Sequence, residues 1–245
     1  MANLIVDEGN TLCKIAVLDK SEVLYEASAR DFDMAETVSL IAKFAIDKAI
    51  VTSTRGGAAK ICEQLREKID RVLHFTSQTD VPVEVEYSSR QTLGTDRIAA
   101  AVGVVRGMGI ENALLVDMGS AITFDIIENG VFRGGNISLG VAMRFKALHD
   151  YTASLPLCSA TEPNGEFGKS TNEAIEQGVM QGILHEIEGY VERVSAEKPK
   201  KCIIFCGGDA ESFVNRIKNA IFAPRKLMFT GLNRILMYNV SKNNI

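Results

Sequence analysis

The chain has 245 residues, of which 46% are hydrophobic and 24% are charged, and its net charge is −4. This composition supports a packed core in one large domain or two small ones. The acidic balance argues against a nucleic-acid or membrane-surface binder, because either role needs a basic face. No apolar run approaches the roughly 18 residues of a membrane span, and the N-terminus has no pattern of a signal peptide. We therefore expect a cytoplasmic protein without nucleic-acid or membrane partners.

Cysteine and histidine usage gives no sign of a disulfide framework or a zinc site. The five cysteines are an odd number, and the three histidines are scattered, so we expect reduced thiols. Cys202 and Cys206 lie in a segment that we interpret as a strand, where they would be about 13 Å apart. That separation is too large for one disulfide or one metal ion.

The first half of the chain predicts strands and helices in alternation. Three strands are expected across 4–28, with a turn at 19–21, and further strands at 49–52, 72–75 and 83–87. Helices are expected at 34–46, 58–69 and 98–108. The glycines at 107 and 109 then break the last helix, and we place the boundary of a first domain, residues 1–109, at this point.

The second half, residues 110–245, repeats the theme. Strands are expected across 113–138, then a helix at 140–151 and a long loop at 152–169. Ser170 and Glu173 have the spacing of a capping box, which predicts the start of a long helix to about 195. A buried strand at 202–206 and helices at 212–219, with Asp209 as N-cap, and 231–240 complete the chain. The pattern predicts an α/β protein with two related domains.

One short motif occurs in both halves. Leu4–Asp19 and Leu114–Asn129 each contain an apolar run, then Asp-x-Gly and a small polar residue, then a second apolar run. Asp-x-Gly alone is a common turn, but its repetition after an apolar strand favours an internal duplication. Two such halves would face each other across a cleft, where a phosphate chain and its metal could bind.

Asp7 and Lys14 carry opposite charges near the first turn. A carboxylate beside a phosphate repels it unless a cation lies between them, so Asp7 implies Mg²⁺, held directly or through water. Lys14, across the hairpin, can neutralise phosphate oxygens. The alternative is that both are ordinary surface charges.

Gly94-Thr95-Asp96-Arg97 follows the polar loop Ser88–Gly94 and opens a helix. A helix start exposes amide groups that can hold an anionic substrate, and a carboxylate there can accept the proton of a substrate hydroxyl. The alternative is that Asp96 is an N-cap and Arg97 is solvated.

Two glycines at 207 and 208 follow a buried strand and precede a helix. They could let a flat adenine base lie on bare backbone. A plain strand-to-helix turn is the alternative, and the residues alone do not separate the two.

Seven stretches together resemble the type III pantothenate kinases, a family of the superfamily that also holds acetate and sugar kinases, actin and Hsp70. They cover nearly the whole chain, and the first, second and fifth are specific as a set. The matching stretches are Asp7–Lys14, Gly94–Arg97, Asp117–Thr123, Gly134–Gly140, Thr152–Pro156, Thr171–Gly178 and Cys206–Ala210. The resemblance implies two related ribonuclease H-like, that is actin-like, domains.

The resemblance also implies an activity, the ATP-dependent phosphorylation of pantothenate at the start of coenzyme A biosynthesis. It implies Asp96 as the base, K⁺ or NH₄⁺ at Asp117, Mg²⁺ with ATP, and a homodimer. The implied ATP-binding residues are Asp7, Glu8, Gly9, Asn10, Thr11, Leu12, Cys13, Lys14 and Ser120. The implied pantothenate-binding residues are Tyr87, Gly94, Thr95, Asp96, Arg97 and Thr171.

Two positions depart from the family pattern: Ser120 stands where Thr is usual, and Leu139 where Pro is usual. Neither removes a chemical group that the reaction needs. Two other functions stay open. One is a nucleotide-binding regulator like the Bvg accessory factors, and the other is a kinase of a different small alcohol or acid.

The long helix from Thr171 is the candidate dimer element. Its apolar residues at 175, 179, 183 and 187 lie roughly on one face. The alternative is that this stripe packs only on its own domain.

Overall fold

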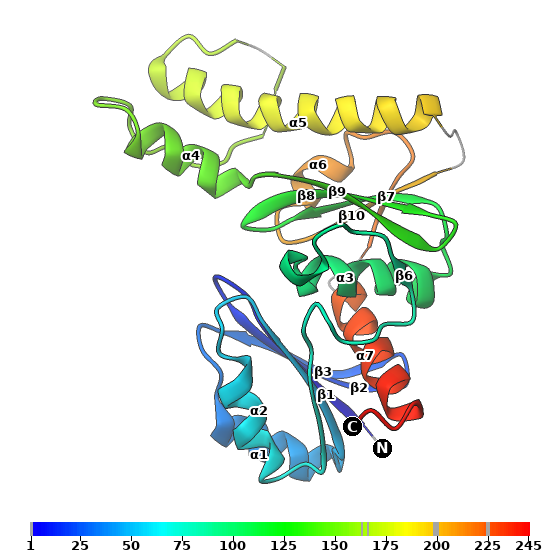
Figure 1. The fold of residues 1–245 in the computed structure, drawn as a ribbon. Helices are drawn as coiled ribbons and strands as arrows, with labels where there is room; N and C mark the ends of the chain where they lie inside the picture. The colour runs from blue at the N-terminus through cyan, green and yellow to red at the C-terminus, as the bar shows by residue number, and fades with distance from the viewer. Residues whose placement is uncertain (1, 163, 166, 198–200, 224–225) are drawn as a thin grey trace. The chain divides into compact units, whose positions relative to one another are not determined.

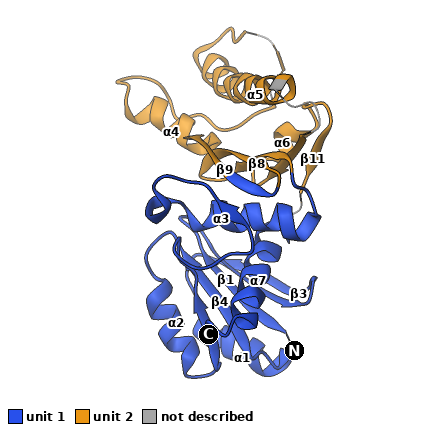
Figure 2. Cartoon of the chain, turned by 45° about the vertical axis from the view of Figure 1, so that its right-hand side comes forward, with its two compact units in different colours: residues 1–111, 130–132, 226–245 blue, residues 112–129, 133–225 orange. Residues whose placement is uncertain are grey.

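The computed structural model describes residues 2–162, 164–165, 167–197, 201–223 and 226–245 (Figure 1). The chain forms two compact units (Figure 2). Unit 1 consists of residues 1–111, 130–132 and 226–245, and unit 2 of residues 112–129 and 133–225. The chain changes unit close to the predicted boundary at 109, but its last helix belongs to unit 1. The division into 1–109 and 110–245 stays a prediction about the two halves of the sequence repeat.

Unit 1 contains a five-stranded sheet in the order β3-β2-β1-β4-β5. The three N-terminal strands pair antiparallel, whereas β4 pairs in parallel with both β1 and β5. The strands are β1 (Asn3–Glu8), β2 (Cys13–Asp19), β3 (Glu22–Ala29), β4 (Lys48–Ser53) and β5 (Arg71–His74). The prediction of three strands followed by alternating helices and strands is confirmed.

Helices line the sheet of unit 1. One core cluster joins β1, β2 and β4 to α1 (Met34–Phe44) and α2 (Ala58–Arg66). Asp33 starts α1 by accepting bonds from the amides of Ala35 and Glu36, at 2.8 and 3.1 Å. The remaining helices of this unit are α3 (Thr95–Val102), which runs into the π-helix η2 (Gly103–Met108), and α7 (Lys226–Ser241), with the short η1 (Arg90–Thr92) before α3.

The C-terminal helix α7 is fastened to the rest of unit 1 by close backbone packing and by buried amides. A Cβ on Gly231 would collide with the carbonyl of Ala99 in α3, so only glycine fits there. Asn233 accepts a hydrogen bond of 2.7 Å from Asn3 Nδ2 and donates one of 2.6 Å to the carbonyl of Lys20. The helix that holds Asp96 is therefore supported by the last residues of the chain.

Unit 2 is built around β7 (Ala113–Met118), β8 (Ala121–Glu128), most of β9 (Val131–Leu139), β10 (Cys202–Cys206) and β11 (Ala220–Phe222). Its helices are α4 (Val141–Asp150), α5 (Thr171–Glu197) and the four-residue α6 (Glu211–Val214). α5 covers the sheet through a large apolar core cluster. The two-residue strand β6 (Glu84–Val85) pairs in parallel with Val131 and Phe132, which belong to unit 1.

The strand order of the second sheet repeats that of the first. Read from β9 to β11, the order is β9-β8-β7-β10-β11, in which β7 pairs antiparallel with β8 and parallel with β10. Each position matches its counterpart in β3-β2-β1-β4-β5. This repetition places Asp7 and Asp117 at equivalent points of two similar sheets, as the duplicated motif predicted.

Most predicted helices differ in their bounds by a few residues, and three differences matter here. α3 begins at Thr95 rather than at 98, and α7 begins at Lys226 rather than at 231. The helix predicted at 212–219 is limited to α6, and β11 was not predicted. Among the described residues, no helix is both long and apolar enough to cross a membrane.

Candidate active site

The first repeated turn places Asp7 at the end of β1, between two neighbours. Lys14 on β2 and Thr52 on β4 are its cross-strand partners. The amide of Gly9 donates a 3.0 Å hydrogen bond to the carbonyl of Leu12, which closes the turn. Asp7 is only 8% exposed, and a buried carboxylate here must be matched by a cation when it is ionised.

The electrostatics of Asp7 fit a site that receives a cation. Burial raises the pKa of Asp7 to about 6, with Lys14 lowering it and Asp96 raising it further. The two carboxyl groups therefore influence one another, and both belong to unit 1. A divalent cation between them would favour their ionised forms.

A hydroxyl pair holds the start of α3 beside this turn. Thr95 Oγ1 lies 2.6 Å from Thr52 Oγ1, and Thr52 is the strand partner of Asp7. Sequence reasoning missed Thr52, because its role arises only when β4 pairs with β1. The contact brings Asp96, the next residue along the chain, to the same end of the sheet.

Asp96 is not the N-cap that the alternative interpretation required. Gly94 occupies the N-cap position, and Asp96 is the second residue of α3. Its Oδ1 accepts a 2.8 Å hydrogen bond from the amide of Arg97. The carboxyl group is half-buried, so a substrate hydroxyl can approach it.

Arg97 is buried, with 5% exposure, and not solvated. Its guanidinium lies 5.7 Å from the ring centroid of Tyr87 and 5.6 Å from that of Phe132. These rings are 6.3 Å apart, so the cation is held by two aromatic faces. Tyr87 and Arg97, both predicted site residues, are thereby brought together in unit 1.

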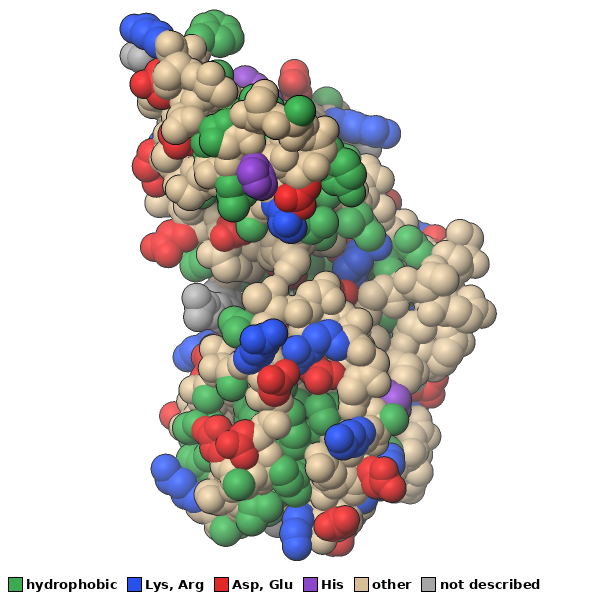
Figure 3. Space-filling view, turned by 90° about the vertical axis from the view of Figure 1, so that its left-hand side faces the viewer, with side chains coloured by type: hydrophobic (Ala, Val, Ile, Leu, Met, Phe, Trp, Pro, Cys, Tyr) green, Lys and Arg blue, Asp and Glu red, His purple; other side chains and the backbone are tan. Residues whose placement is uncertain are grey.

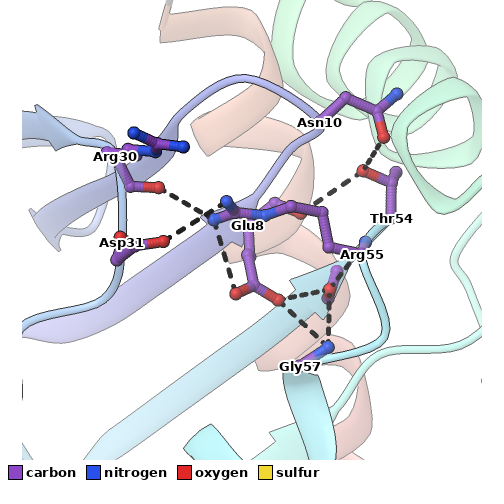
Figure 4. Close-up of polar contacts among 8 residues, drawn as sticks. Glu8, Asn10, Arg30, Asp31, Thr54, Arg55 and Gly57 are labelled. Carbon is purple, nitrogen blue, oxygen red and sulfur yellow. Dashed lines mark hydrogen bonds and ion pairs between the residues drawn. The ribbon is translucent and has the colours of Figure 1, made fainter.

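A loop after β4 braces the first repeated turn, as Figure 4 shows. The Glu8 carboxylate accepts hydrogen bonds from the Ser53 hydroxyl and from the amide of Gly57, the latter at 3.1 Å. The Arg55 guanidinium lies 3.4 Å from the other Glu8 oxygen. Thr54 Oγ1 also lies 3.4 Å from Asn10 Oδ1. Sequence reasoning found no signal in this loop, because its serine, threonine and arginine have no distinctive spacing.

The remaining residues of the first turn differ in how exposed their side chains are to a ligand. Cys13 is buried, and burial raises the pKa of its thiol to about 11, so the side chain belongs to the core. Only its backbone could reach a ligand. Leu12 is 41% exposed, and Asn10 and Thr11 are exposed beside it.

The second repeated turn, in unit 2, is enclosed by backbone. Asp117 pairs across the strands with Thr123 and with Cys206. A Cβ on Gly207, which has φ +95°, would collide with the carbonyl of Met118 and come within 2.6 Å of Asp117 Oδ1. A Cβ on Gly140 would likewise meet the carbonyls of Gly119 and Ser120. Gly140 and Gly207, which belong to two of the seven stretches that carry the family resemblance, therefore pack directly on this turn.

The predicted N-cap role of Asp209 is wrong. Its amide donates a 3.1 Å hydrogen bond to the carbonyl of Met118 at the end of β7. This bond keeps residue 209 in the strand-to-helix connection, so α6 starts later, with Ala210 as its N-cap. Burial raises the pKa of the Asp209 carboxyl.

The start of α5 carries Thr171 and half of the predicted capping box. Ser170 Oγ accepts a 3.3 Å hydrogen bond from the amide of Glu173. The reciprocal bond is displaced by one residue, because the Glu173 carboxylate accepts from the amide of Lys169 at 2.7 Å. Thr171 lies on the wall of an open groove of about 810 Å³ between α4 and α5.

The apolar stripe of α5 packs on its own unit. Ile175, Val179, Ile183 and Ile187 are all buried in the core cluster of unit 2. The alternative interpretation is therefore correct, and the stripe is no exposed dimer surface. Other apolar side chains near the groove are exposed, among them Tyr151 at 89% and Leu139 at 45%. Hydrophobic side chains are visible at the surface of this unit in the upper part of Figure 3.

The protein groups fit a magnesium ion that is bound with its nucleotide. In the described part of the chain, no three His, Cys, Asp or Glu side chains converge as a metal site. A lone carboxylate such as Asp7 is the kind of ligand that Mg²⁺ uses when phosphates and water complete its shell.

The chain matches known proteins over nearly its whole length. The family model "Type III pantothenate kinase" matches residues 3–193. A protein of that name from Bacteroides fragilis is 39% identical over 241 residues, covering 97% of this chain and 98% of the relative. One from Azobacteroides pseudotrichonymphae is 36% identical over 237 residues, covering 96% of each chain.

Solved structures agree on the fold. A putative Baf family transcriptional activator from Campylobacter jejuni has a TM-score of 0.65 at 25% identity, covering 97% of this chain and 99% of that one. A putative N-acetylmannosamine kinase from Listeria monocytogenes has a TM-score of 0.56 at 13% identity, covering 98% and 100%.

Two sheets of the same topology, each with an Asp-x-Gly turn after its first strand, define a two-domain actin-like fold. The predicted fold class is thus confirmed. Within that class, the chain belongs to the type III pantothenate kinase family.

Proposed function

We propose that this kinase transfers the γ-phosphoryl group of ATP to the primary hydroxyl of pantothenate, the first step toward coenzyme A. The observation that carries the proposal is the placement of Asp96 beside the Asp7 turn through the Thr52–Thr95 hydroxyl pair. Phosphoryl transfer needs an activated hydroxyl close to a phosphate-binding turn, and both lie in unit 1. Full-length similarity to named pantothenate kinases supports the choice of alcohol.

The proposed roles in unit 1 follow from charge and position. Asp96 orients the substrate hydroxyl and accepts its proton. Asp7 faces the magnesium that accompanies ATP, and Lys14, its strand partner, faces phosphate oxygens. Bound Mg²⁺ would neutralise the developing charge on the phosphates.

The rest of the phosphate turn acts through its backbone and its shape. Gly9 closes the turn, and Glu8 holds the bracing loop through Ser53, Gly57 and Arg55. Asn10 and Thr11 are exposed in this turn, and we assign them to the phosphate oxygens. In unit 2, the Ser120 hydroxyl is proposed to contact phosphate oxygens, as the threonine usual at this position would.

Pantothenate is assigned to the start of α3. The amides at Gly94 and Thr95 open a helix and favour an anionic group, and the buried guanidinium of Arg97 adds a positive charge held by Tyr87. A carboxylate is the matching feature of the substrate. Thr171 is assigned to the same substrate from a second subunit.

We assign a monovalent cation, K⁺ or NH₄⁺, to Asp117. The support is the family resemblance, the half-buried carboxylate and one neighbouring carbonyl. A Cβ on Gly207 would meet both the carbonyl of Met118 and Asp117 Oδ1, so these two oxygens lie near one another. Carboxylate and carbonyl oxygens are suitable ligands for a hard cation.

A homodimer is proposed through the groove between α4 and α5. Its support is the exposed apolar surface there, including Tyr151 and Leu139, which a second copy would cover. Tyr151→Glu should shift the sedimentation coefficient from dimer to monomer. Phe167→Glu, at a position 97% exposed and outside the groove, should leave the dimer intact. A wild type that sediments as a monomer would exclude this assembly.

Mixing two inactive variants tests whether the active site is shared. Asp96→Asn and Thr171→Phe are unfolded and refolded together. If Thr171 serves the neighbouring site, half of the random dimers carry one intact site, and about a quarter of wild-type activity returns. Sites built within one chain would stay inactive, because every site would hold one lesion.

The activity itself is tested with purified protein, ATP, Mg²⁺, K⁺ and pantothenate, measuring both ADP and phosphopantothenate. Equal amounts of the two products are expected. ADP release only with another alcohol would make the chain a different kinase. Nucleotide binding without any transfer would favour the regulatory role of a Bvg accessory factor.

A further inference from the structure

Phe132 contacts Arg97 at a place that no motif of the sequence predicted. It is the second residue of β9 and belongs to unit 1 together with Tyr87 and Arg97. Its side chain is 1% exposed, so it cannot touch a substrate directly, whereas Tyr87 is half-buried. Any role of Phe132 in substrate binding must therefore act through its neighbours.

The backbone of Phe132 holds the segment that carries Tyr87. Val85 of β6 pairs in parallel with Phe132, and the amide of Glu86 donates a 2.9 Å hydrogen bond to the carbonyl of Phe132. Tyr87 is the next residue along the chain. The position of Phe132 therefore helps to set where the Tyr87 ring lies.

The guanidinium carbon of Arg97 and the centroids of the two rings form a nearly equilateral triangle. Arg97 Cζ lies 5.6 Å from the Phe132 centroid and 5.7 Å from the Tyr87 centroid. The two centroids are 6.3 Å apart, and the ring planes are inclined at 49°. Both rings thus lie on one side of the cation and form a notch, rather than a sandwich that encloses it from above and below.

This notch is suited to fixing the direction of a buried guanidinium. Arg97 is 5% exposed, and burying a cation costs free energy unless its surroundings offset the charge. Aromatic faces supply part of that offset, and they do so most strongly when the cation is desolvated. A guanidinium also presents its N–H groups in one plane, as a fork that matches a carboxylate. Contact with a buried ring therefore restricts the direction in which the fork can point.

We propose that Phe132 is a positioning residue of the kinase. It holds the Arg97 guanidinium in the orientation that binds the substrate carboxylate, and it thereby makes the site select a hydroxy acid over the same alcohol without the acid group. The inference rests on the proposed function, in which Arg97 meets the carboxylate of pantothenate. It adds a residue that lies outside the seven stretches of family resemblance, because an apolar residue in a strand has no distinctive signature.

A series of fluorinated phenylalanines at position 132 tests the electrostatic part of this role. Fluorine withdraws electron density from the face of the ring and weakens its attraction for a cation, while the shape of the side chain changes little. We expect the KM for pantothenate to rise stepwise from phenylalanine through monofluoro- to trifluorophenylalanine, by up to about tenfold. The kcat and the KM for ATP should stay within about twofold of wild type, as expected when only substrate binding is weakened.

Pantothenol, in which a hydroxymethyl group replaces the carboxylate, separates recognition of the acid group from the rest of the substrate. Values of kcat/KM for both compounds are taken from initial rates below saturation. Phe132→Leu should lower kcat/KM for pantothenate by about tenfold and leave that for pantothenol within about twofold. Phe213→Leu is the matched control, because it removes a fully buried ring from the core of unit 2. It should lose stability and keep the selectivity of wild type.

The outcomes separate a positioning role from a purely structural one. A stepwise rise confined to the KM for pantothenate supports the inference. A flat fluorine series, or equal losses for both compounds in Phe132→Leu, would reduce Phe132 to a core residue. If Phe132→Leu does not fold, the fluorine series decides alone, because it keeps the shape of the ring. A wild type that forms no phosphopantothenate would overturn the proposed function as well, whereas a flat series in an active wild type overturns this inference alone.

Discussion

The two repeated turns start from the same sequence pattern but differ in closure and surroundings. The amide of Gly9 bonds to the carbonyl three residues on, whereas the amide of Gly119 bonds to the carbonyl of Ala121, two residues on, at 3.0 Å. The first turn is thus one residue longer. It places Lys14 opposite Asp7, whereas Thr123 lies opposite Asp117.

This difference changes the charge that each turn offers. The first carboxylate is buried beside an ammonium group and a second carboxylate, so it suits a site that holds a divalent cation and phosphates. The second lies beside a hydroxyl and a thiol, under glycine backbone, and suits a weaker, singly charged ion. One inserted residue and a few different cross-strand partners are therefore enough to give two copies of the same motif different electrostatic surroundings.

The largest expected effect concerns Asp96, the proposed base beside the first turn. Asp96→Asn keeps the shape but cannot accept a proton, so kcat should fall by roughly 10²–10⁴. ATP affinity should change little, because Asn carries no new bulk. Asp70→Asn, at an exposed position, is the matched control in the same steady-state assay. Turnover near that of the wild type would reduce Asp96 to a structural residue.

Because backbone encloses the second turn, adding a side chain at Gly207 should destabilise the protein. Gly207→Ala forces an L residue to φ +95° and drives its Cβ into the carbonyl of Met118, which should cost roughly 2–4 kcal/mol of unfolding free energy. The next glycine is the control, since a Cβ on Gly208 has nothing within 4 Å. Gly208→Ala should therefore differ from wild type by less than about 0.5 kcal/mol in urea unfolding. Similar values for both would mean that the turn can move.

Burial of Asp7 predicts a pH dependence of stability in the first turn. Its pKa of about 6 in the folded protein lies above the ordinary value of 3.8. The folded state therefore keeps a proton that the unfolded chain releases, and wild-type stability falls as the pH rises from about 4 to 6. Asp7→Asn removes this loss. Above pH 7, the unfolding free energy of the variant relative to wild type should therefore be higher by roughly 2–3 kcal/mol than it is at low pH.

The measurement is urea unfolding of both proteins at pH 4.5 and 7.5, without Mg²⁺ or ATP. Parallel curves for Asp7→Asn would show that the first carboxylate is not desolvated in solution.

The smallest expected effect is the response to potassium. Activity in Na⁺ buffer should rise on adding K⁺, by up to about tenfold, the equivalent of 1.4 kcal/mol. Asp117→Ala should remove this response, while Asp7→Ala should abolish transfer in either buffer. Initial rates in matched NaCl and KCl series give the answer. A K⁺ response that survives Asp117→Ala would mean that the monovalent cation binds at another site.

Local pattern was sufficient to predict most of the elements. The three N-terminal strands and the break of the helix at Gly109 are properties of neighbouring residues, and each is present. The duplicated motif also predicted the repeated sheet. These signals depend on periodicity and turn chemistry, which a single sequence contains.

What was missed depends on partners far along the chain. Thr52 matters because parallel pairing places it between Asp7 and Thr95. α6 begins late because the Asp209 amide bonds to Met118. Such effects are tertiary and override local propensity. The role of Asp96 comes from its place at a helix start and from family resemblance, whereas those of Asp117, Ser120 and Thr171 come from resemblance alone. All four stay predictions until the variants are measured.

The packing of α7 on α3 has a consequence for how the protein is made. Gly231 fits against Ala99, and Gly103 against the carbonyl of Leu227 at 2.5 Å from where a Cβ would stand. A ribosome delivers residues 226–245 after every strand and helix of unit 2. The sheet of unit 1 must therefore wait for α7 to emerge before the unit can be completed. Stalling or termination within the codons for residues 226–245 would release a chain with a complete second unit and an unfinished first one.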